Sequence, residues 1–233
     1  MTEAAEERFP VPVPLPAGAV EVSAVFGPAL PASVADAPIV VIAHGAGAGM
    51  DHPFLLGFSA ALRAEGLHTL RFTFPYLEAG RRMPGPAAHA VLTWRAVVAE
   101  ARRRTRGPVF GCGKSYGGRM ASMAAAEESG LDVAGLAYLG YPLHPPGKPE
   151  KPRIEHLPAV RQPQLFVEGT NDPFVQPLAQ LEAAVASCRD ARIAWVDGGG
   201  HSFEVKGRTR PPVEVGAGIA PVVVGFARSL STE

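Results

Sequence analysis

The chain has 233 residues, which is within the usual size of one large α/β domain and long enough to bury a core without a metal ion or disulfide bridges. Its 22 basic residues balance its 22 acidic ones, so the composition argues against binding to nucleic acid or to an anionic membrane, and two cysteines cannot form a disulfide framework. Because the sequence has no signal-peptide pattern and no run of about 18 apolar residues, we expect a cytoplasmic protein that acts on a small molecule; the composition leaves its oligomeric state open.

Within the N-terminal residues 1–18, the segment Phe9–Gly18 is crowded with prolines, and proline has no amide hydrogen to donate to a neighbouring strand. We therefore expect an extended arm, or at most an edge strand, followed by a single domain over residues 19–233. Short apolar runs predict strands at Val20–Phe26, Pro38–Ala43, His68–Phe74, Pro108–Gly113, Val133–Gly140, Gln164–Glu168 and Ala191–Val196. Helical patterns lie between them at Pro53–Glu65, Ala87–Arg104, Tyr116–Glu128, Leu178–Ser187 and Val213–Leu230. This alternation predicts a mostly parallel sheet with helices on both faces and with its chemistry in the loops at the carboxyl ends of the strands.

The strongest motif is Gly-Lys-Ser-Tyr-Gly at residues 113–117, between a predicted strand and a predicted helix. The pattern Gly-x-Ser-x-Gly in this setting is typical of a nucleophile elbow, a strained turn that exposes the serine hydroxyl and needs small residues on both sides. Ser115 is therefore the predicted nucleophile. A phosphate-binding loop also ends in Gly-Lys-Ser, but it would need a glycine at position 108, where this chain has Pro108, and it would follow the strand.

An acid and a histidine follow two later strands in the order that a serine nucleophile of this kind requires. Asp172 lies in the loop after Gln164–Glu168, and His201 follows three glycines after Ala191–Val196. We predict that His201 acts as the general base and that Asp172 orients it. Glu168 and Asp197 are competing acids, but Asp197 is only four residues from His201 and would have to fold back.

The glycine-rich segment His-Gly-Ala-Gly-Ala-Gly at residues 44–49 follows a buried strand. A hydrolase needs a second backbone donor from this loop, so the amides of Ala46 and Tyr116 are the predicted oxyanion hole. The segment also resembles part of a dinucleotide-binding motif, although the third glycine is replaced by Met50. A nicotinamide-binding alternative stays open, with Arg71 as a candidate for contact with a 2′-phosphate.

Three further residues near strand ends are candidates for a substrate pocket: His52, Arg71 and His144. Surface or structural roles are the competing interpretation for each of them. Lys114 occupies the variable position of the elbow, where we expect it to pack or to face solvent.

The chain resembles the small α/β-hydrolases related to dienelactone hydrolase over residues 38–205. The motifs that carry this resemblance are HGAGAGMDHPF, RFTFPY, GKSYGGRMAS, YPLHPPGKPEK, GTNDPF and GGGHSF. It implies an α/β-hydrolase fold with an eight-stranded core, hydrolysis of an ester-like bond, and catalytic roles for Ser115, Asp172 and His201. The triad mechanism itself requires no metal or organic cofactor. Dienelactone hydrolase uses a cysteine nucleophile where this chain has Ser115, so lactone specificity is not implied.

Many relatives insert a lid domain between the strands that end near Gly140 and begin near Gln164, whereas this chain has only about twenty residues there. We therefore predict a cap-less serine hydrolase whose open site suits small or short-acyl esters. The alternative from a different functional class is a non-catalytic binding or scaffold protein that keeps this fold.

Overall fold

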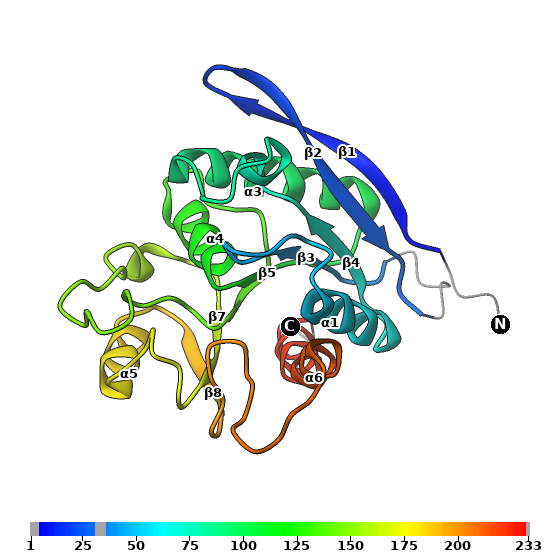
Figure 1. Ribbon diagram of the computed structural model, residues 1–233. Coiled ribbons are helices and arrows are strands. Elements are labelled where there is room, and N and C mark those ends of the chain that lie inside the picture. Colours follow the sequence, from blue (N-terminus) through cyan, green and yellow to red (C-terminus); the bar gives the residue numbers. More distant parts are fainter. Residues whose placement is uncertain (1–4, 31–35, 232–233) are drawn as a thin grey trace.

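The computed structural model describes residues 5–30 and 36–231, which form an eight-stranded sheet in the order β1-β2-β4-β3-β5-β6-β7-β8 (Figure 1). The strands from β3 to β8 run parallel, and β1 and β2 join the sheet in antiparallel pairs. The strands are β1 (Glu7–Leu15), β2 (Gly18–Gly27), β3 (Ile39–Ala43), β4 (His68–Phe72), β5 (Val109–Lys114), β6 (Gly135–Leu139), β7 (Gln164–Gly169) and β8 (Ala191–Val196). The helices are α1 (Pro53–Ala64), α2 (Pro75–Glu78), α3 (Ala87–Arg104), α4 (Tyr116–Ala126), η1 (Leu157–Ala159), α5 (Leu178–Ala186) and α6 (Pro212–Ser229).

The core has two layers because alternate strand residues point to opposite faces of the sheet. Val41 packs with Trp94 of α3 in one layer, and Ile42 packs in the other with α1 and α6. Figure 1 shows α1 and α6 side by side on their face. Glycine permits this close approach, since a Cβ added at Gly57 would lie 1.9 Å from the carbonyl oxygen of Val213. Both faces of the central strands are therefore covered, as the sequence predicts.

The proline-rich segment is an edge strand and not a separate arm, because β1 pairs with β2 along its whole length. Val11 and Val13 are buried in the layer that contains α3, while Pro10, Pro12 and Pro14 alternate with them and are exposed. The two strands form the long hairpin seen in Figure 1. Because of this alternation, the prolines lie on the exposed face of β1, and the buried valines pack the strand against the core.

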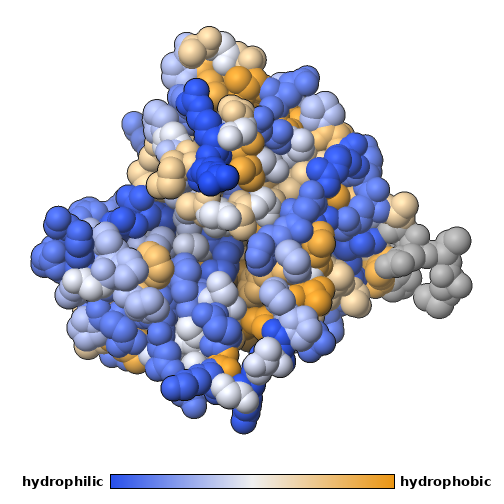
Figure 2. Space-filling model, viewed as in Figure 1, coloured by the Kyte–Doolittle hydropathy of each residue, from blue (hydrophilic) through white to orange (hydrophobic). Residues whose placement is uncertain are grey.

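The remaining differences from the sequence prediction are shifted element ends and two short helices that were not predicted, α2 and η1. Strand β4 ends at Phe72 and not at Phe74, because Pro75 begins the unpredicted short helix α2. Residues 140–163, between β6 and β7, contain only the single turn η1, so they form no lid domain. No helix within residues 5–30 and 36–231 is long and apolar enough to cross a membrane. Figure 2 shows a largely hydrophilic surface on which hydrophobic residues gather over α1 and near the tip of the β1–β2 hairpin.

Candidate functional site

Ser115 lies on a strained turn between β5 and α4. Its backbone has φ 50° and ψ −115°, a conformation that L-residues rarely adopt, and its amide donates to the carbonyl oxygen of Leu139 at 2.9 Å. Neither flanking glycine can be larger. A Cβ at Gly113 would lie 2.2 Å from the amide nitrogen of Gly118, and one at Gly117 would lie 2.6 Å from the carbonyl oxygen of His44. The structure therefore contains the predicted sharp strand–helix turn.

Ser115, His201 and Asp172 meet at the carboxyl ends of their strands in one chain of hydrogen bonds. The Nε2 atom of His201 is 2.9 Å from Oγ of Ser115, and its Nδ1 is 2.6 Å from Oδ2 of Asp172. One imidazole tautomer satisfies both contacts, with Nδ1–H donating to the carboxylate and Nε2 accepting from the hydroxyl. Asp172 is completely buried, and its Oδ1 accepts from the amide of Phe174 at 2.8 Å. The Phe174 ring lies against His201, with the ring centroids 4.2 Å apart.

The two competing acids make other contacts. Glu168 is buried and accepts from the amide of Tyr141, and burial raises the pKa of its carboxyl group well above the usual range. Asp197 is exposed and lies 3.4 Å from the Thr170 hydroxyl. Asp172 is thus the acid that contacts His201.

The loop after β3 brings Ala46 to the same cavity as Ser115. His44 fixes the start of this loop, because its Nδ1 donates to the Gly45 carbonyl oxygen at 2.7 Å and its Nε2 accepts from the amide of Phe74 at 3.1 Å. Burial lowers the pKa of His44, which favours the neutral ring that these two contacts need. Tyr116 is the first residue of α4, so its amide has no acceptor within the helix. Both residues predicted for the oxyanion hole are therefore close to Ser115: Ala46 lines the same cavity, and Tyr116 is the next residue in the chain.

The cavity at Ser115 has a volume of about 320 Å³. Its walls are mainly apolar and include Phe54, Leu55 and Phe174, together with His201. His52, one of the predicted pocket residues, also lines it, and the Nδ1 atom of its ring accepts from the amide of Phe54 at 3.3 Å. None of the residues that line this cavity is acidic.

The two other predicted pocket residues do not line this cavity. Arg71 is 1% exposed because its guanidinium binds the carboxylates of Glu6, at 2.6 Å, and Asp51, at 3.5 Å. Those contacts leave it unsuited to a 2′-phosphate, which removes the residue on which the nicotinamide alternative depended. His144 is completely buried, and its Nδ1 is 2.8 Å from the carbonyl oxygen of Pro145. Its segment turns inward after β6, where its amide donates to the carbonyl oxygen of Phe174.

Two contacts near the site were not predicted. The Tyr76 hydroxyl donates to the carbonyl oxygen of Ala46 at 2.9 Å, and Nζ of Lys114 donates to the carbonyl oxygen of His201 at 2.7 Å. Lys114 therefore does more than pack or face solvent, since its ammonium group is hydrogen-bonded to the main chain. Both side chains bind main-chain oxygens far away in the sequence, and such contacts leave no motif by which they could be recognised.

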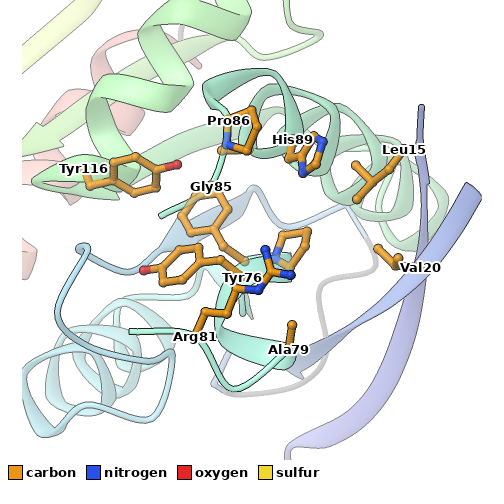
Figure 3. A pocket seen from close by; sticks show the side chains of 12 residues that line it. Leu15, Val20, Tyr76, Ala79, Arg81, Gly85, Pro86, His89 and Tyr116 are labelled. Carbon is orange, nitrogen blue, oxygen red and sulfur yellow. The ribbon is translucent and has the colours of Figure 1, made fainter. Parts of the chain in front are cut away.

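A second cavity of about 190 Å³ lies beyond Tyr76 and Tyr116. Figure 3 shows these tyrosines on one side of it, with Leu15 and Val20 of the β1–β2 hairpin on the other. Tyr76 and Tyr116 pack edge to face, with ring centroids 6.2 Å apart, and both line this cavity but not the one at Ser115. Within residues 5–30 and 36–231, no group of three or more His, Cys, Asp or Glu side chains could hold a metal ion.

Comparison with known proteins agrees with this architecture. The family model described as alpha/beta hydrolase domain matches residues 36–213 of the chain. Among solved structures, Est1E from Butyrivibrio proteoclasticus with bound ferulic acid is 17% identical, with a TM-score of 0.72 and coverage of 91% of this chain and 96% of its own. Dienelactone hydrolase from Anabaena variabilis is 20% identical, with a TM-score of 0.68 and coverage of 96% and 98%.

A third similar structure is an α/β serine hydrolase without a lid from Xanthomonas campestris. It is 19% identical, with a TM-score of 0.70, and the match covers 94% of each chain. At these identities the likeness concerns the fold. The predicted cap-less architecture, related to that of dienelactone hydrolase, is confirmed at this level.

Proposed function

Because the chain belongs to the α/β-hydrolase family, we propose that it is a serine hydrolase that cleaves small or short-acyl esters at Ser115. The observation that carries this proposal is the hydrogen-bonded chain from Asp172 through His201 to the serine hydroxyl. A serine hydroxyl on a strained turn and hydrogen-bonded to a base, together with the amides of Ala46 and Tyr116 as proposed oxyanion donors, would supply the parts that acyl transfer requires.

In the proposed mechanism, Ser115 Oγ attacks the substrate carbonyl carbon while Nε2 of His201 takes the hydroxyl proton. Asp172 holds the imidazole in the required tautomer and stabilises the positive charge that forms on it. The amides of Ala46 and Tyr116 donate to the oxyanion of the tetrahedral intermediate. His201 then protonates the leaving alcohol. In the second half of the reaction, His201 takes a proton from water as the water oxygen attacks the acyl-enzyme, and it returns this proton to Ser115 Oγ when the carboxylic acid is released. Apart from the hydrolytic water, the proposed steps use side chains and main-chain groups of the protein.

The shape of the site supports small substrates. The cavity of about 320 Å³ is at the lower end of the range of about 300–1,000 Å³ that is usual for small-molecule sites. The segment between β6 and β7 adds no cover to it. Its apolar walls suit a short acyl or alkyl group, with the ester carbonyl held at Ser115.

The test is labelling with a fluorophosphonate probe, which reacts covalently with activated serines. The wild-type protein should be labelled and should hydrolyse p-nitrophenyl acetate, and Ser115→Ala should do neither. Ser122→Ala is a matched control, because Ser122 is completely buried on α4, 2.7 Å from Nε2 of His156. A wild type that takes no label and hydrolyses no ester would contradict the proposal and would favour the non-catalytic scaffold.

A further inference from the structure

Lys114 is the last residue of β5 and directly precedes the proposed nucleophile. Its main chain is held in the sheet, where it pairs with Leu139 of β6. Its ammonium group reaches the loop after β8 and donates to the carbonyl oxygen of His201 at 2.7 Å. One residue therefore links the turn that carries Ser115 to the loop that carries His201.

The loop that carries His201 has few other restraints at that residue. The three glycines before it, at positions 198–200, are each hydrogen-bonded to the loop after β7 or to residues near them in the chain. Within residues 5–30 and 36–231, the contact from Lys114 is the only hydrogen bond made to the main chain of His201. Between these glycines and the buried Phe203, the contact from Lys114 therefore acts on the main chain of His201 itself, while the imidazole makes its own hydrogen bonds to Ser115 and Asp172.

Gly140 and Phe203 lie next to the ammonium group of Lys114. A Cβ at Gly140 would lie 3.2 Å from Nζ and 2.8 Å from the carbonyl oxygen of His201, so a larger residue there would crowd both partners. The ring of Phe203 lies on another side, with its centroid 5.6 Å from Nζ. Phe203 is completely buried and has φ 65°, which fixes the chain just after His201.

The titratable groups that face this ammonium are carboxyl groups from three segments, and one of them, Glu168, has the raised pKa described above. They are Glu168 on β7, Asp172 in the loop after β7, and Glu204 in the loop after β8. Burial lowers the pKa of Lys114 to about 8, and these three carboxyl groups act in the opposite direction. The amine is thus charged at neutral pH and loses its proton as the pH rises through about 8.

We propose that Lys114 is a positioning residue whose ammonium group holds the main chain of His201 where its imidazole can reach both Ser115 and Asp172. This inference rests on the proposed function, in which His201 is the base. A hydrogen bond from a charged donor is roughly twice as strong as one from a neutral donor. The loop is therefore held more firmly by the ammonium than by the neutral amine.

The test compares Lys114→Met, which keeps the side-chain length without a donor, with the wild type on p-nitrophenyl acetate. Lys114→Met should lower kcat by about 10–100-fold, the effect expected when a charged hydrogen bond to a reacting unit is lost, and should change KM by less than about threefold. The wild type should lose kcat above pH 8, and this alkaline decrease should be absent from Lys114→Met. Lys148→Met, at an exposed lysine, is the control and should keep the wild-type profile.

The outcomes separate this inference from the function on which it rests. A wild type that hydrolyses no ester would contradict the hydrolase proposal itself. A wild type that is active, with a Lys114→Met variant that keeps its kcat and the alkaline decrease, would overturn only the role of Lys114. If Lys114→Met does not fold, Lys114→Arg gives the answer, because arginine stays charged. Its alkaline decrease should move above that of the wild type, and an unchanged decrease near pH 8 would overturn the inference.

Discussion

The hydroxyl of Tyr76, on the short helix α2, donates a hydrogen bond to the carbonyl oxygen of Ala46, 2.9 Å away in the loop after β3. Burial raises the pKa of Tyr76 to about 12, so the hydroxyl stays protonated and can donate throughout the neutral range. Because the hydrogen bond from Tyr76 holds the carbonyl group of Ala46, it restricts the orientation of the neighbouring peptide units. The amide of Ala46 belongs to one of these units.

Tyr76→Phe removes this hydrogen bond and keeps the ring. We expect kcat for a short ester to fall by about 2–10-fold, the equivalent of one neutral hydrogen bond, with little change in KM. Steady-state kinetics on p-nitrophenyl acetate measures the effect, and thermal unfolding reports whether the fold is intact. An unchanged kcat would show that the loop keeps its conformation without Tyr76.

Asp172→Asn keeps the size of the side chain but removes the charge that holds the His201 tautomer. We expect kcat to fall by about 10³–10⁴-fold, because the imidazole can then present a protonated nitrogen to Ser115. Asp197→Asn changes the exposed competing acid and should leave kcat within about twofold of the wild type, the range of a surface change away from the site. The reverse ranking of the two variants would assign the acid to Asp197.

Acyl-chain length is predicted to decide which esters are cleaved. The cavity of about 320 Å³ has room for a short acyl group, and no lid between β6 and β7 extends its apolar walls over a longer chain. We expect kcat/KM for p-nitrophenyl acetate to exceed that for the palmitate ester by about tenfold or more, because the extra methylene groups find no pocket. Assays of the acetate, butyrate and palmitate esters below their micelle concentrations measure this ratio; a maximum at palmitate would contradict the prediction.

Gly117→Ala is expected to destabilise the protein, because the added Cβ would lie 2.6 Å from the carbonyl oxygen of His44 and 2.8 Å from Cβ of Ala43. We expect a loss of about 3 kcal/mol in the free energy of unfolding, as for other overpacked sites. Gly225→Ala is the matched control on α6, since its Cβ would meet nothing within 4 Å. It should stabilise the helix by about 0.5–1 kcal/mol. Urea unfolding of both variants measures the difference.

The stability of the protein is expected to fall in mild acid because of His156. Its Nε2 is 2.7 Å from the Ser122 hydroxyl, and burial, together with the nearby charge of Arg119, lowers the pKa of His156 from 6.5 to about 4 against the opposing effect of Glu155. Between those two pH values the unfolded chain binds a proton that the folded chain does not, so stability decreases as the pH falls from 6.5 to 4. The decrease amounts to at most about 3 kcal/mol.

Chemical unfolding of the wild type at pH 7 and pH 4.5 measures this loss. His156→Gln should reduce the difference between the two pH values, whereas His89→Gln, on α3 and outside this cluster, should not. Equal differences in all three proteins would mean that other groups govern stability in acid.

The meeting of Ser115, Asp172 and His201 could be anticipated from the sequence because each follows a short apolar run. The carboxyl ends of parallel strands share one edge of a sheet, so residues just beyond three such runs lie near one another. Position near a strand end does not, however, determine the direction of a side chain. Arg71 is still within β4, where its guanidinium lies between the carboxylates of Glu6 and Asp51 and does not line the cavity.

The contacts of Tyr76 and Lys114 could not be anticipated for another reason. Each binds a main-chain carbonyl oxygen, and every residue has one. The residue type of the partner therefore gives no indication in the sequence that it accepts this hydrogen bond. Their geometry depends on how the loops after β3 and β8 fold over the sheet. Such contacts become visible only in three dimensions.

The alternation of valine and proline in β1 also has a consequence for assembly. In a strand, the main-chain N–H and C=O groups of successive residues point to opposite edges. The residues of β1 that form hydrogen bonds with β2 therefore alternate with residues whose N–H and C=O groups point away from the sheet. The prolines at positions 10, 12 and 14 are compatible with β1 only if their main-chain groups point away from β2, because the residues that pair with β2 must donate N–H groups to it. At these three positions, the unpaired edge of β1 then has carbonyl oxygens but no N–H groups with which a second chain could pair. Aggregation by addition of a strand is thereby disfavoured at this end of the sheet, although the valines of β1 have a high β propensity.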